Sequence, residues 1–276
     1  MYQQYFENKI AIVTGGGSGI GRALCLQLAH AGATVICTDI NQERAEETTK
    51  SILGKGEAWF LDVTDEASIT ALIDKVVSKF GRLDLIFNNA GIAVSGELRD
   101  IKLNDWKRLM DINFYGVLYG SHAAYQVMLK QGSGHIINTA SAAGLASGLA
   151  LMAPYSVSKH AVVDYTHILR IEAKALGVKA SVVCPGFVDT AIGDSAVEAN
   201  AKPNWKNKAQ NTLKRGLSAD KAAIKILKGV EANKETIVFP RAIKIAMRID
   251  RILGGVVKKM MQKELADFRA NYRLPD

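Results

Sequence analysis

Apolar and polar positions along the chain follow two alternating patterns. Short apolar runs rich in β-branched residues are separated by longer segments in which apolar residues recur every three or four positions. The short runs are typical of strands buried on both faces of a parallel sheet, and the longer pattern is typical of amphipathic helices. The runs predict seven strands, at residues 9–13, 33–38, 57–61, 83–87, 134–139, 179–184 and 236–239. Helices are predicted near residues 19–31, 41–53, 65–80, 104–130, 155–176 and 218–232.

This order of elements predicts the fold class. Strands that alternate with helices form parallel βαβ units, and right-handed crossovers place helices on both faces of the sheet. We therefore expect an α/β fold with a doubly wound, parallel, seven-stranded, Rossmann-like sheet. The connections are short and no low-complexity linker or fixed-period repeat is present, so residues 1–276 are expected to form a single domain.

The first strand is followed by a glycine-rich stretch. In sheets of this kind, ligands bind beyond the carboxyl ends of the strands. Residues 14–24 read TGGGSGIGRAL, with Gly15, Gly19 and Gly21 in the pattern T-G-x-x-x-G-x-G. Glycines let the chain approach a pyrophosphate closely, and the next helix offers its free N–H groups to the phosphates. A glycine-rich turn without a ligand is the alternative, but the position between a strand and a helix favours a phosphate site.

Asp39 ends the second predicted strand and bears on the choice of dinucleotide. A carboxylate here accepts hydrogen bonds from an adenosine ribose and repels a 2′-phosphate. No basic residue follows until Arg44, so the sequence favours NAD over NADP. The alternative is that Asp39 serves only as the N-cap of the next helix.

Tyr155 and Lys159 lie four residues apart in the sequence PYSVSKHAV. In a helix, side chains at this spacing share one face, so the ammonium group can reach the phenol. A free tyrosine has a pKa of about 10, and a cation that lowers it by about three units contributes roughly 4 kcal/mol of differential interaction. The pair is therefore a candidate for acid/base chemistry.

Together these segments resemble the short-chain dehydrogenase/reductase superfamily, from about Lys9 to Pro240. The resemblance rests on pieces in the expected order: TGGGSGIG at 14–21, Asp39, LDV at 61–63, NNAG at 88–91, Asn113, Ser141, YSVSK at 155–159 and CPGFVDT at 184–190. It implies a single dinucleotide-binding and catalytic domain. The cofactor site that it implies consists of Gly15, Ser18, Gly19, Ile20, Gly21, Asp39, Asp62, Val63, Asn89, Ala90, Gly91, Tyr155, Lys159, Pro185, Gly186, Val188 and Thr190.

The resemblance also implies four catalytic residues. Tyr155 would exchange a proton with the substrate oxygen, with Lys159 favouring the phenolate. Ser141 would orient the same oxygen, and Asn113 would hold a water that links Lys159 to solvent. The histidines form no metal-ligand spacing with Cys, Asp or Glu, so no metal site is expected.

The expected function is that of an NAD-dependent oxidoreductase acting on CH–OH groups and interconverting a secondary alcohol and a ketone. The long segment after the sixth strand, with Trp205, and the leucines before Tyr155 suggest an apolar pocket for a steroid-, retinoid- or lipid-like substrate. One alternative is an NADP-preferring 3-oxoacyl-thioester reductase, which Asp39 disfavours. Another is a dinucleotide-sensing protein without catalysis, which the complete set of four residues disfavours.

Composition and charge narrow the cellular setting. Three separated cysteines in apolar segments suggest free thiols, and no apolar run approaches the length of a bilayer, so a cytoplasmic protein is expected. Residues 1–201 hold 17 Lys and Arg against 20 Asp and Glu, a net −3, whereas the remaining 75 residues hold 18 against 7, a net +11. Because the basic residues are confined to one end without interleaved aromatic residues, a nucleic-acid partner is not expected.

The C-terminal residues 241–276 are expected to form a basic, amphipathic helical extension. Its apolar stripe is predicted at Ile245, Ile249, Ile252, Val256 and Met260. Packing on the domain or a partner subunit is the favoured role, and the alternatives are peripheral membrane contact through 241–263 and an acidic partner protein. The superfamily's usual short tail is absent, which favours a homodimer through the long helices over a homotetramer, although both remain open.

Overall fold

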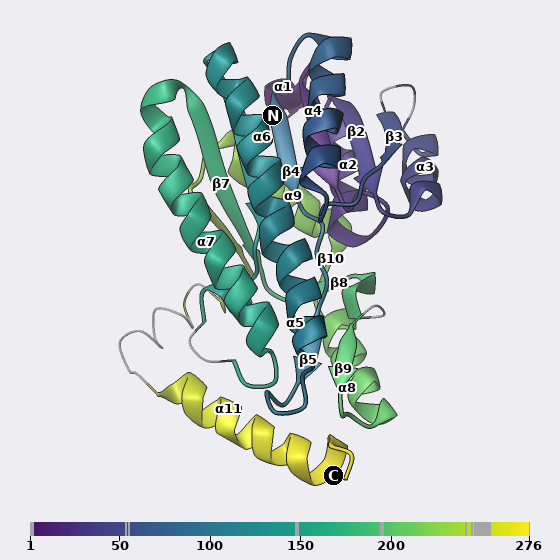
Figure 1. The fold of residues 1–276 in the computed structure, drawn as a ribbon, viewed down its shortest axis with the longest axis vertical. Helices are drawn as coiled ribbons and strands as arrows, with labels where there is room; N and C mark the ends of the chain where they lie inside the picture. The colour runs from purple at the N-terminus through teal and green to yellow at the C-terminus, as the bar shows by residue number, and fades with distance from the viewer. Residues whose placement is uncertain are drawn as a thin grey trace.

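A parallel sheet forms the centre of the molecule. The structure is a computed structural model that describes residues 3–52, 54, 56–146, 149–193, 196–240, 242, 243, 245 and 255–275. The sheet has seven strands in the order β11-β7-β6-β4-β1-β2-β3, and every neighbouring pair is parallel (Figure 1). The strands are β1 Ile10–Thr14, β2 Thr34–Asp39, β3 Gly56–Phe60, β4 Leu85–Asn88, β6 Gly134–Thr139, β7 Val178–Pro185 and β11 Thr236–Phe239. The predicted seven-stranded sheet is confirmed.

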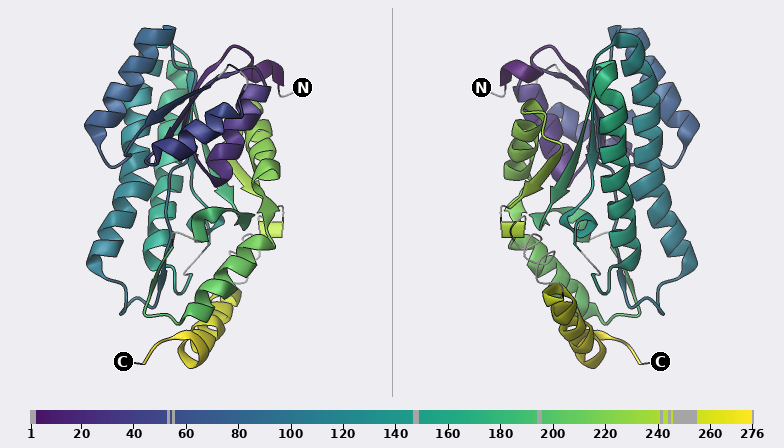
Figure 2. Two further views of the ribbon diagram at one scale, coloured as in Figure 1. Left: turned by 90° about the vertical axis from the view of Figure 1, so that its right-hand side faces the viewer. Right: turned by 90° about the vertical axis from the view of Figure 1, so that its left-hand side faces the viewer.

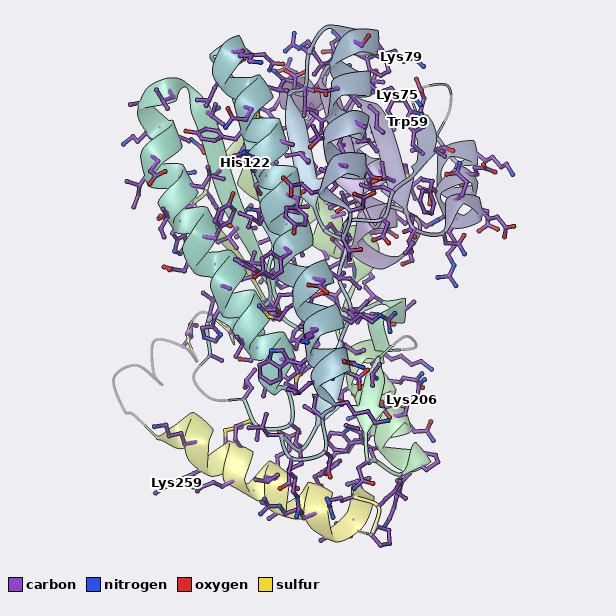
Figure 3. All side chains as sticks on the ribbon, viewed as in Figure 1. Trp59, Lys75, Lys79, His122, Lys206 and Lys259 are labelled. Carbon is purple, nitrogen blue, oxygen red and sulfur yellow. The ribbon has the colours of Figure 1, made fainter. Side chains whose placement is uncertain are left out.

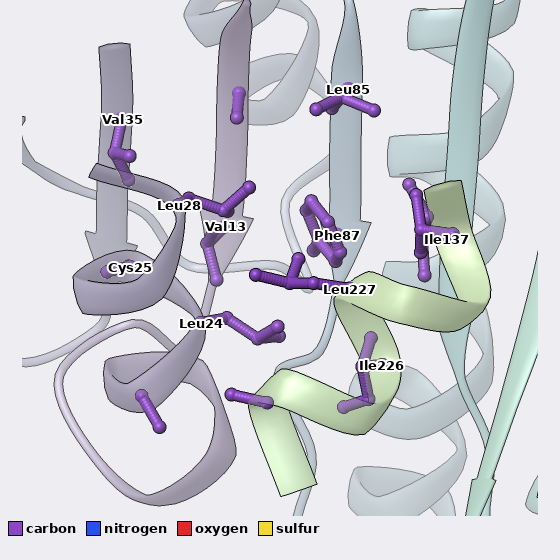
Figure 4. Packing of buried hydrophobic residues seen from close by; sticks show 14 of the residues in the cluster. Val13, Leu24, Cys25, Leu28, Val35, Leu85, Phe87, Ile137, Ile226 and Leu227 are labelled. Carbon is purple, nitrogen blue, oxygen red and sulfur yellow. The ribbon is translucent and has the colours of Figure 1, made fainter. Parts of the chain in front are cut away.

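Helices cover both faces of this sheet, as predicted (Figures 1 and 2). One face carries α2 Gly19–His30, α3 Gln42–Lys50 and α9 Ala219–Glu231. The other carries α4 Glu66–Phe80, α6 Gly116–Gln131 and α7 Ala153–Ala173. Neighbouring strand residues alternate between the two cores, so that Val13 packs toward α2 and α9, whereas Ile12 packs toward α4 and α6. Figure 4 shows the first core, in which Phe87 lies close to Leu227.

The helix predicted at residues 104–130 is interrupted. It consists of α5 Leu103–Met110, a π-helical turn Asp111–Tyr115 and α6. The apolar periodicity continues through the turn, so the sequence pattern does not reveal it. Extra residues inserted into a helix in this way are frequent at functional sites, and this turn carries Asn113.

The segment after β7 is not the long loop that the sequence suggests. It forms β8 Val188–Asp189, a 3-10 turn Ala191–Gly193, β9 Val197–Ala199, α8 Pro203–Lys214 and β10 Leu217–Ser218. β9 pairs with β5 Val94–Gly96, and β10 pairs with β8. Pro203 at the start of α8 suits the first turn of a helix, where its missing N–H group costs nothing.

The chain ends in α11 Val256–Asp267 and a π-helical turn Phe268–Tyr272, which lie beside α8 (Figures 1 and 2). Of the predicted apolar stripe, the structure describes only the side chains of Ile245 and Met260, and neither is packed. Met260 is 60 % exposed and Ile245 is 58 % exposed, whereas Phe268 is fully buried. Ile249, Ile252 and the side chain of Val256 lie outside what the structure describes, as do residues 241, 244 and 246–254 of the region expected to touch a membrane.

The remaining short elements are α1 Gln3–Phe6 and the 3-10 turns Ala142–Gly144 and Lys174–Leu176. Within the described part of the chain, none of the helices has the length and apolar character that a membrane crossing requires.

Candidate active site

The glycine-rich loop after β1 has a shape that only glycine permits. Gly15 and Gly19 have φ angles of +65° and +50°, in the left-handed region. A Cβ atom at Gly21 would lie 2.0 Å from the carbonyl oxygen of Gly15, so the loop and the first turn of α2 are in direct contact. Ser18 occupies the N-cap position of α2 without a side-chain cap, which leaves the first N–H groups of the helix for phosphate oxygens. Ile20, in the first turn of α2, is partly buried against the core.

Thr14 fastens this loop to the segment after β4. Its hydroxyl accepts hydrogen bonds from the main-chain N–H groups of Asn89 at 2.9 Å and Ala90 at 3.0 Å. The Asn89 amide donates in return to the Thr14 carbonyl at 3.1 Å. Thr14 is a site residue that the glycine pattern does not indicate, although its hydroxyl lies at the end of a buried strand and needs a hydrogen-bond partner there.

Asp39 lies against the glycine-rich loop. One carboxylate oxygen accepts from the N–H group of Gly17 at 3.0 Å, and the other accepts from the N–H group of Asn41 at 2.9 Å. The N-cap of α3 is Asn41, whose side chain accepts from the N–H group of Arg44, so the interpretation of Asp39 as an N-cap is wrong. The carboxylate is instead fixed beside the glycine-rich loop, and its contact with a ribose stays a prediction.

Asp62 and Val63 follow β3, the edge strand. Asp62 accepts hydrogen bonds from the N–H group and the hydroxyl of Thr64, at 2.9 and 2.8 Å. Val63 is buried close to Gly116 at the start of α6, where an added Cβ atom would lie 3.0 Å from the valine side chain. These contacts hold the turn after β3 in place.

The segment after β7 borders the glycine-rich loop from the other side. Gly186 follows Pro185 and donates to the carbonyl oxygen of Phe239 at 2.8 Å, and Val188 is buried. A Cβ atom at Gly19 would lie 3.1 Å from the Thr190 side chain. The structure therefore brings the residues expected at the phosphate end and at the nicotinamide end to one edge of the sheet.

Ser141, Tyr155 and Lys159 meet beyond the ends of β6 and β7. Ser141 lies two residues after the end of β6, and its hydroxyl accepts from the N–H group of Ala143 at 3.1 Å. Tyr155 lies in the first turn of α7, and Lys159 follows one turn later. The ammonium group of Lys159 donates to the carbonyl oxygen of Thr139 at 2.9 Å and lies 5.7 Å from the centroid of the Tyr155 ring.

Burial dominates the electrostatics of this cluster. It raises the pKa of Tyr155 above the usual value for a phenol, and a hydrogen bond with the Ser141 side chain opposes that rise. Burial also lowers the pKa of Lys159 to about 8. The sequence predicted a lowered pKa for Tyr155, but in the protein by itself the pKa is raised. Desolvation of the phenolate outweighs the interactions that stabilise it.

Cys184, at the end of β7, belongs to the same cluster, which our sequence reasoning did not anticipate. Burial raises the pKa of its thiol to about 12, although the nearby Lys159 ammonium opposes the rise. The side chain consequently remains a neutral thiol at neutral pH and adds apolar volume next to Tyr155. The sequence does not predict that Cys184 lies in this cluster, because a cysteine within an apolar strand has the pattern of any other core residue.

Asn113 is fully buried in the π-helical turn. Its side-chain oxygen accepts from the N–H group of Ile92 at 2.8 Å, and its amide donates to the Ile92 carbonyl at 2.9 Å. A Cβ atom at Gly91 would lie 3.2 Å from this oxygen and 3.6 Å from the Lys159 nitrogen, so both side chains approach the same loop. Asn113 thus holds the loop after β4, and its part in a proton relay stays a prediction.

No group of three or more His, Cys, Asp or Glu side chains among the described residues is placed to hold a metal ion. The site instead combines a glycine-lined loop, a carboxylate at the end of β2 and a Ser-Tyr-Lys cluster. This arrangement fits a dinucleotide, because the first N–H groups of α2 have no side-chain cap and the glycines let the chain approach a phosphate closely.

Comparison with known proteins identifies the family. The family model described as short chain dehydrogenase matches residues 9–201. The chain belongs to the short-chain dehydrogenase/reductase family. Members of this family are oxidoreductases that use NAD or NADP, and the fold and the order of motifs agree with that membership.

Individual members of the short-chain dehydrogenase family are similar over most of the chain. Cyclohexanol dehydrogenase from Acinetobacter sp. (strain SE19) is 36 % identical over 193 residues, which cover 68 % of this chain and 76 % of the relative. The putative oxidoreductase SadH from Mycobacterium tuberculosis (strain CDC 1551 / Oshkosh) is 31 % identical, with 95 % of this chain and 97 % of the relative covered. A short-chain dehydrogenase/reductase from Burkholderia phymatum, solved in complex with NAD, is 31 % identical and superposes with a TM-score of 0.84 over 90 % of this chain and 95 % of its own.

Proposed function

We propose that the protein is an NAD-dependent oxidoreductase that interconverts a secondary alcohol and a ketone. The observation that carries the proposal is the Ser141, Tyr155 and Lys159 cluster, which lies at the same sheet edge as the glycine-rich loop. The cyclohexanol dehydrogenase relative supports a secondary alcohol as the substrate class. The NAD in the Burkholderia phymatum relative supports the cofactor.

Tyr155 is the group that would exchange a proton with the substrate oxygen. The bound nicotinamide would supply or accept the hydride. Ser141 lies close enough to Tyr155 to oppose the rise in the pKa of the phenol, so a substrate oxygen placed between the two hydroxyls would be oriented by both. Lys159 is held by the Thr139 carbonyl, which fixes its charge near the phenol and stabilises the phenolate as it forms.

Asp39 supports NAD as the preferred dinucleotide. Its carboxylate is locked by the N–H groups of Gly17 and Asn41, so it cannot turn away from a group bound beside the loop without losing both bonds. A 2′-phosphate on the ribose would bring a second negative charge to this corner, which like-charge repulsion disfavours.

Replacement of Tyr155 by Phe tests the chemistry. We expect Tyr155→Phe to bind NADH with unchanged affinity, measured by nucleotide fluorescence, and to lose turnover of cyclohexanol by about 100-fold or more, since general acid/base catalysis typically contributes 100-fold to 10,000-fold. Tyr115→Phe is the matched control, because Tyr115 is 42 % exposed on the π-helical turn. Retention of most activity in Tyr155→Phe would refute the role of the phenol.

Replacement of Asp39 by Asn tests the cofactor preference. Asparagine keeps an oxygen acceptor for the loop but removes the charge. A hydrogen bond to a charged group is worth about 1.5–3 kcal/mol, so kcat/KM with NAD should fall by roughly 10-fold to 100-fold, while kcat/KM with NADP rises. A wild-type preference for NADP together with turnover of an acetoacetyl thioester would instead favour the 3-oxoacyl-thioester reductase.

A further inference from the structure

The C-terminal segment lies against the part of the chain that leads into Tyr155. Leu151, four residues before the tyrosine, has a φ of 63°, which is uncommon for a residue other than glycine. It is buried in a separate apolar cluster with Trp205 of α8 and Phe268 of the C-terminal turn. Such backbone geometry persists only where surrounding contacts hold it, and here the contacts come from two distant parts of the sequence.

Aromatic and charged contacts join α8 to the C-terminal segment. The rings of Trp205 and Phe268 meet edge to face, with centroids 5.0 Å apart. Lys208 reaches across from α8, where it pairs with Asp267 at 2.8 Å and lies 4.7 Å from the centroid of the Tyr272 ring. Figure 1 shows α11 passing below α8 and β5. The contacts between α8 and the C-terminal segment therefore lie at the lower end of the molecule as drawn.

Main-chain hydrogen bonds also connect the residues before α8 to the C-terminal segment. The N–H group of Lys202 donates to the carbonyl oxygen of Tyr272 at 2.7 Å, and that of Leu274 donates to Asn200 at 3.0 Å. Ala201 and Arg273 form an antiparallel bridge. The residues between β9 and α8 are therefore paired with the end of the chain.

Two carboxylates beside β5 complete the attachment. Arg273 donates two hydrogen bonds to Asp100, at 3.0 and 3.1 Å, and both side chains are about nine-tenths buried. Arg269 donates to Glu97, which Arg99 also approaches at 3.3 Å. Forked bonds between arginine and a carboxylate fix geometry as well as charge. β5 also donates to Leu151, through the N–H group of Gly96 at 2.8 Å, so the carboxylates and the loop before Tyr155 are anchored to the same strand.

We propose that Arg273 and Phe268 are positioning residues of the substrate site: they hold α8 and the Leu151 loop together beside Tyr155 and so set how tightly the alcohol is bound. This proposal rests on the proposed function. Under this proposal, the basic C-terminal segment binds two acidic residues of its own chain, Glu97 and Asp100.

Arg273→Met tests the proposal in the full chain, with cyclohexanol and NAD as the probes. Misplacement of a positioning element costs up to about 100-fold, so we expect KM for cyclohexanol to rise by about 10-fold or more. The kcat and the affinity for NADH should change less than about twofold, because neither the glycine-rich loop nor the Ser-Tyr-Lys cluster is altered. Trypsin should also cleave α8 faster, at Lys206, Lys208 or Lys214.

Three further variants keep the test decisive. Lys259→Met removes the same charge from an exposed site on α11, labelled in Figure 3, and should leave KM and cleavage unchanged. Arg273→Lys should restore part of the KM loss, because lysine keeps the charge without the fork. Asp100→Asn replaces Arg273→Met as the test variant if Arg273→Met does not fold, because Asn has nearly the same volume as Asp. We expect Asp100→Asn to raise KM for cyclohexanol as well.

The outcomes separate this proposal from the proposed function. Unchanged KM and unchanged tryptic cleavage in Arg273→Met and Asp100→Asn would overturn the positioning role. Equal losses in NADH affinity and in KM would also overturn it, because they indicate general destabilisation. If the wild-type protein binds NADH but oxidises no alcohol, the proposed function fails, and the rate of cleavage in α8 alone then decides whether the C-terminal segment holds it.

Discussion

His135 is buried in β6 in a setting that keeps its ring neutral. One ring nitrogen, Nε2, lies 2.8 Å from the hydroxyl of Ser181, which itself donates to the Lys234 carbonyl at 2.6 Å. Nε2 must therefore carry the proton and donate, and the other nitrogen has no hydrogen-bond partner among the residues that the structure describes. Burial, together with the charges of Lys179 and Arg170, lowers the pKa of His135 to about 3.

The lowered pKa predicts a loss of stability in mild acid. The unfolded chain takes up a proton near the ordinary histidine pKa of about 6.5, whereas the folded protein does not take it up until about pH 3. The contribution of His135 is fully present above pH 6.5 and is lost as the pH falls below it. At 1.36 kcal/mol for each pKa unit, the free energy of unfolding should drop by about 2 kcal/mol between pH 7 and pH 5 through this residue.

Urea unfolding at both pH values measures this drop. His135→Gln should lose about 2 kcal/mol less than the wild-type protein between pH 7 and pH 5, whatever its stability at pH 7. His122→Gln is the matched control, because His122 is exposed on α6, as labelled in Figure 3. If His135→Gln shows the same pH dependence as the wild-type protein, the histidine is not held neutral and the reasoning fails.

Three further changes probe the loop, its anchor and the subunit contact. Gly21→Ala would place a methyl group 2.0 Å from the Gly15 carbonyl oxygen, so NADH binding measured by calorimetry should fall below detection, and normal affinity would contradict the assigned loop. Thr14→Val keeps the side-chain shape but leaves the half-buried N–H groups of Asn89 and Ala90 without this partner, which should lower the free energy of unfolding in urea by about 1–3 kcal/mol; a loss under about 0.5 kcal/mol would contradict the anchor. Ile168 and Ile171 of α7 are 48 % and 73 % exposed, and we expect them to lie in a homodimer contact. Ile171→Asp should therefore weaken the dimer by about tenfold or more in sedimentation velocity, and a monomeric wild-type protein would exclude that contact.

The sequence predicted the sheet because each strand is recognisable from the apolar residues of a short, continuous stretch of the chain. Strands buried on both faces appear as continuous apolar runs, and the residues of each run in the core alternate between the two helix layers. The order of strands and helices then limits the topology through the handedness of the crossovers. The glycine-rich loop was visible for the same reason, because it directly follows a strand.

The break in the helix around Asn113 was not visible. Its apolar pattern continues through the π-helical turn, so the periodicity cannot distinguish a bulge from a straight helix. The π turn depends on where Asn113 must meet Ile92, which is a contact between separate elements. The direction of the Tyr155 pKa shift was likewise inaccessible, since it depends on how deeply the folded chain buries the phenol.

The sequence by itself therefore determined the layers of the fold, the place of the phosphate loop and the spacing of Tyr155 and Lys159. Tertiary structure alone decided that Thr14 joins two strand ends, that Cys184 stands near Lys159 and that Arg273 meets Asp100. The first group follows from periodicity and short-range geometry, which the chain carries at every position. The second group depends on residues brought together from distant segments, and no local pattern records which buried group will become the partner of another.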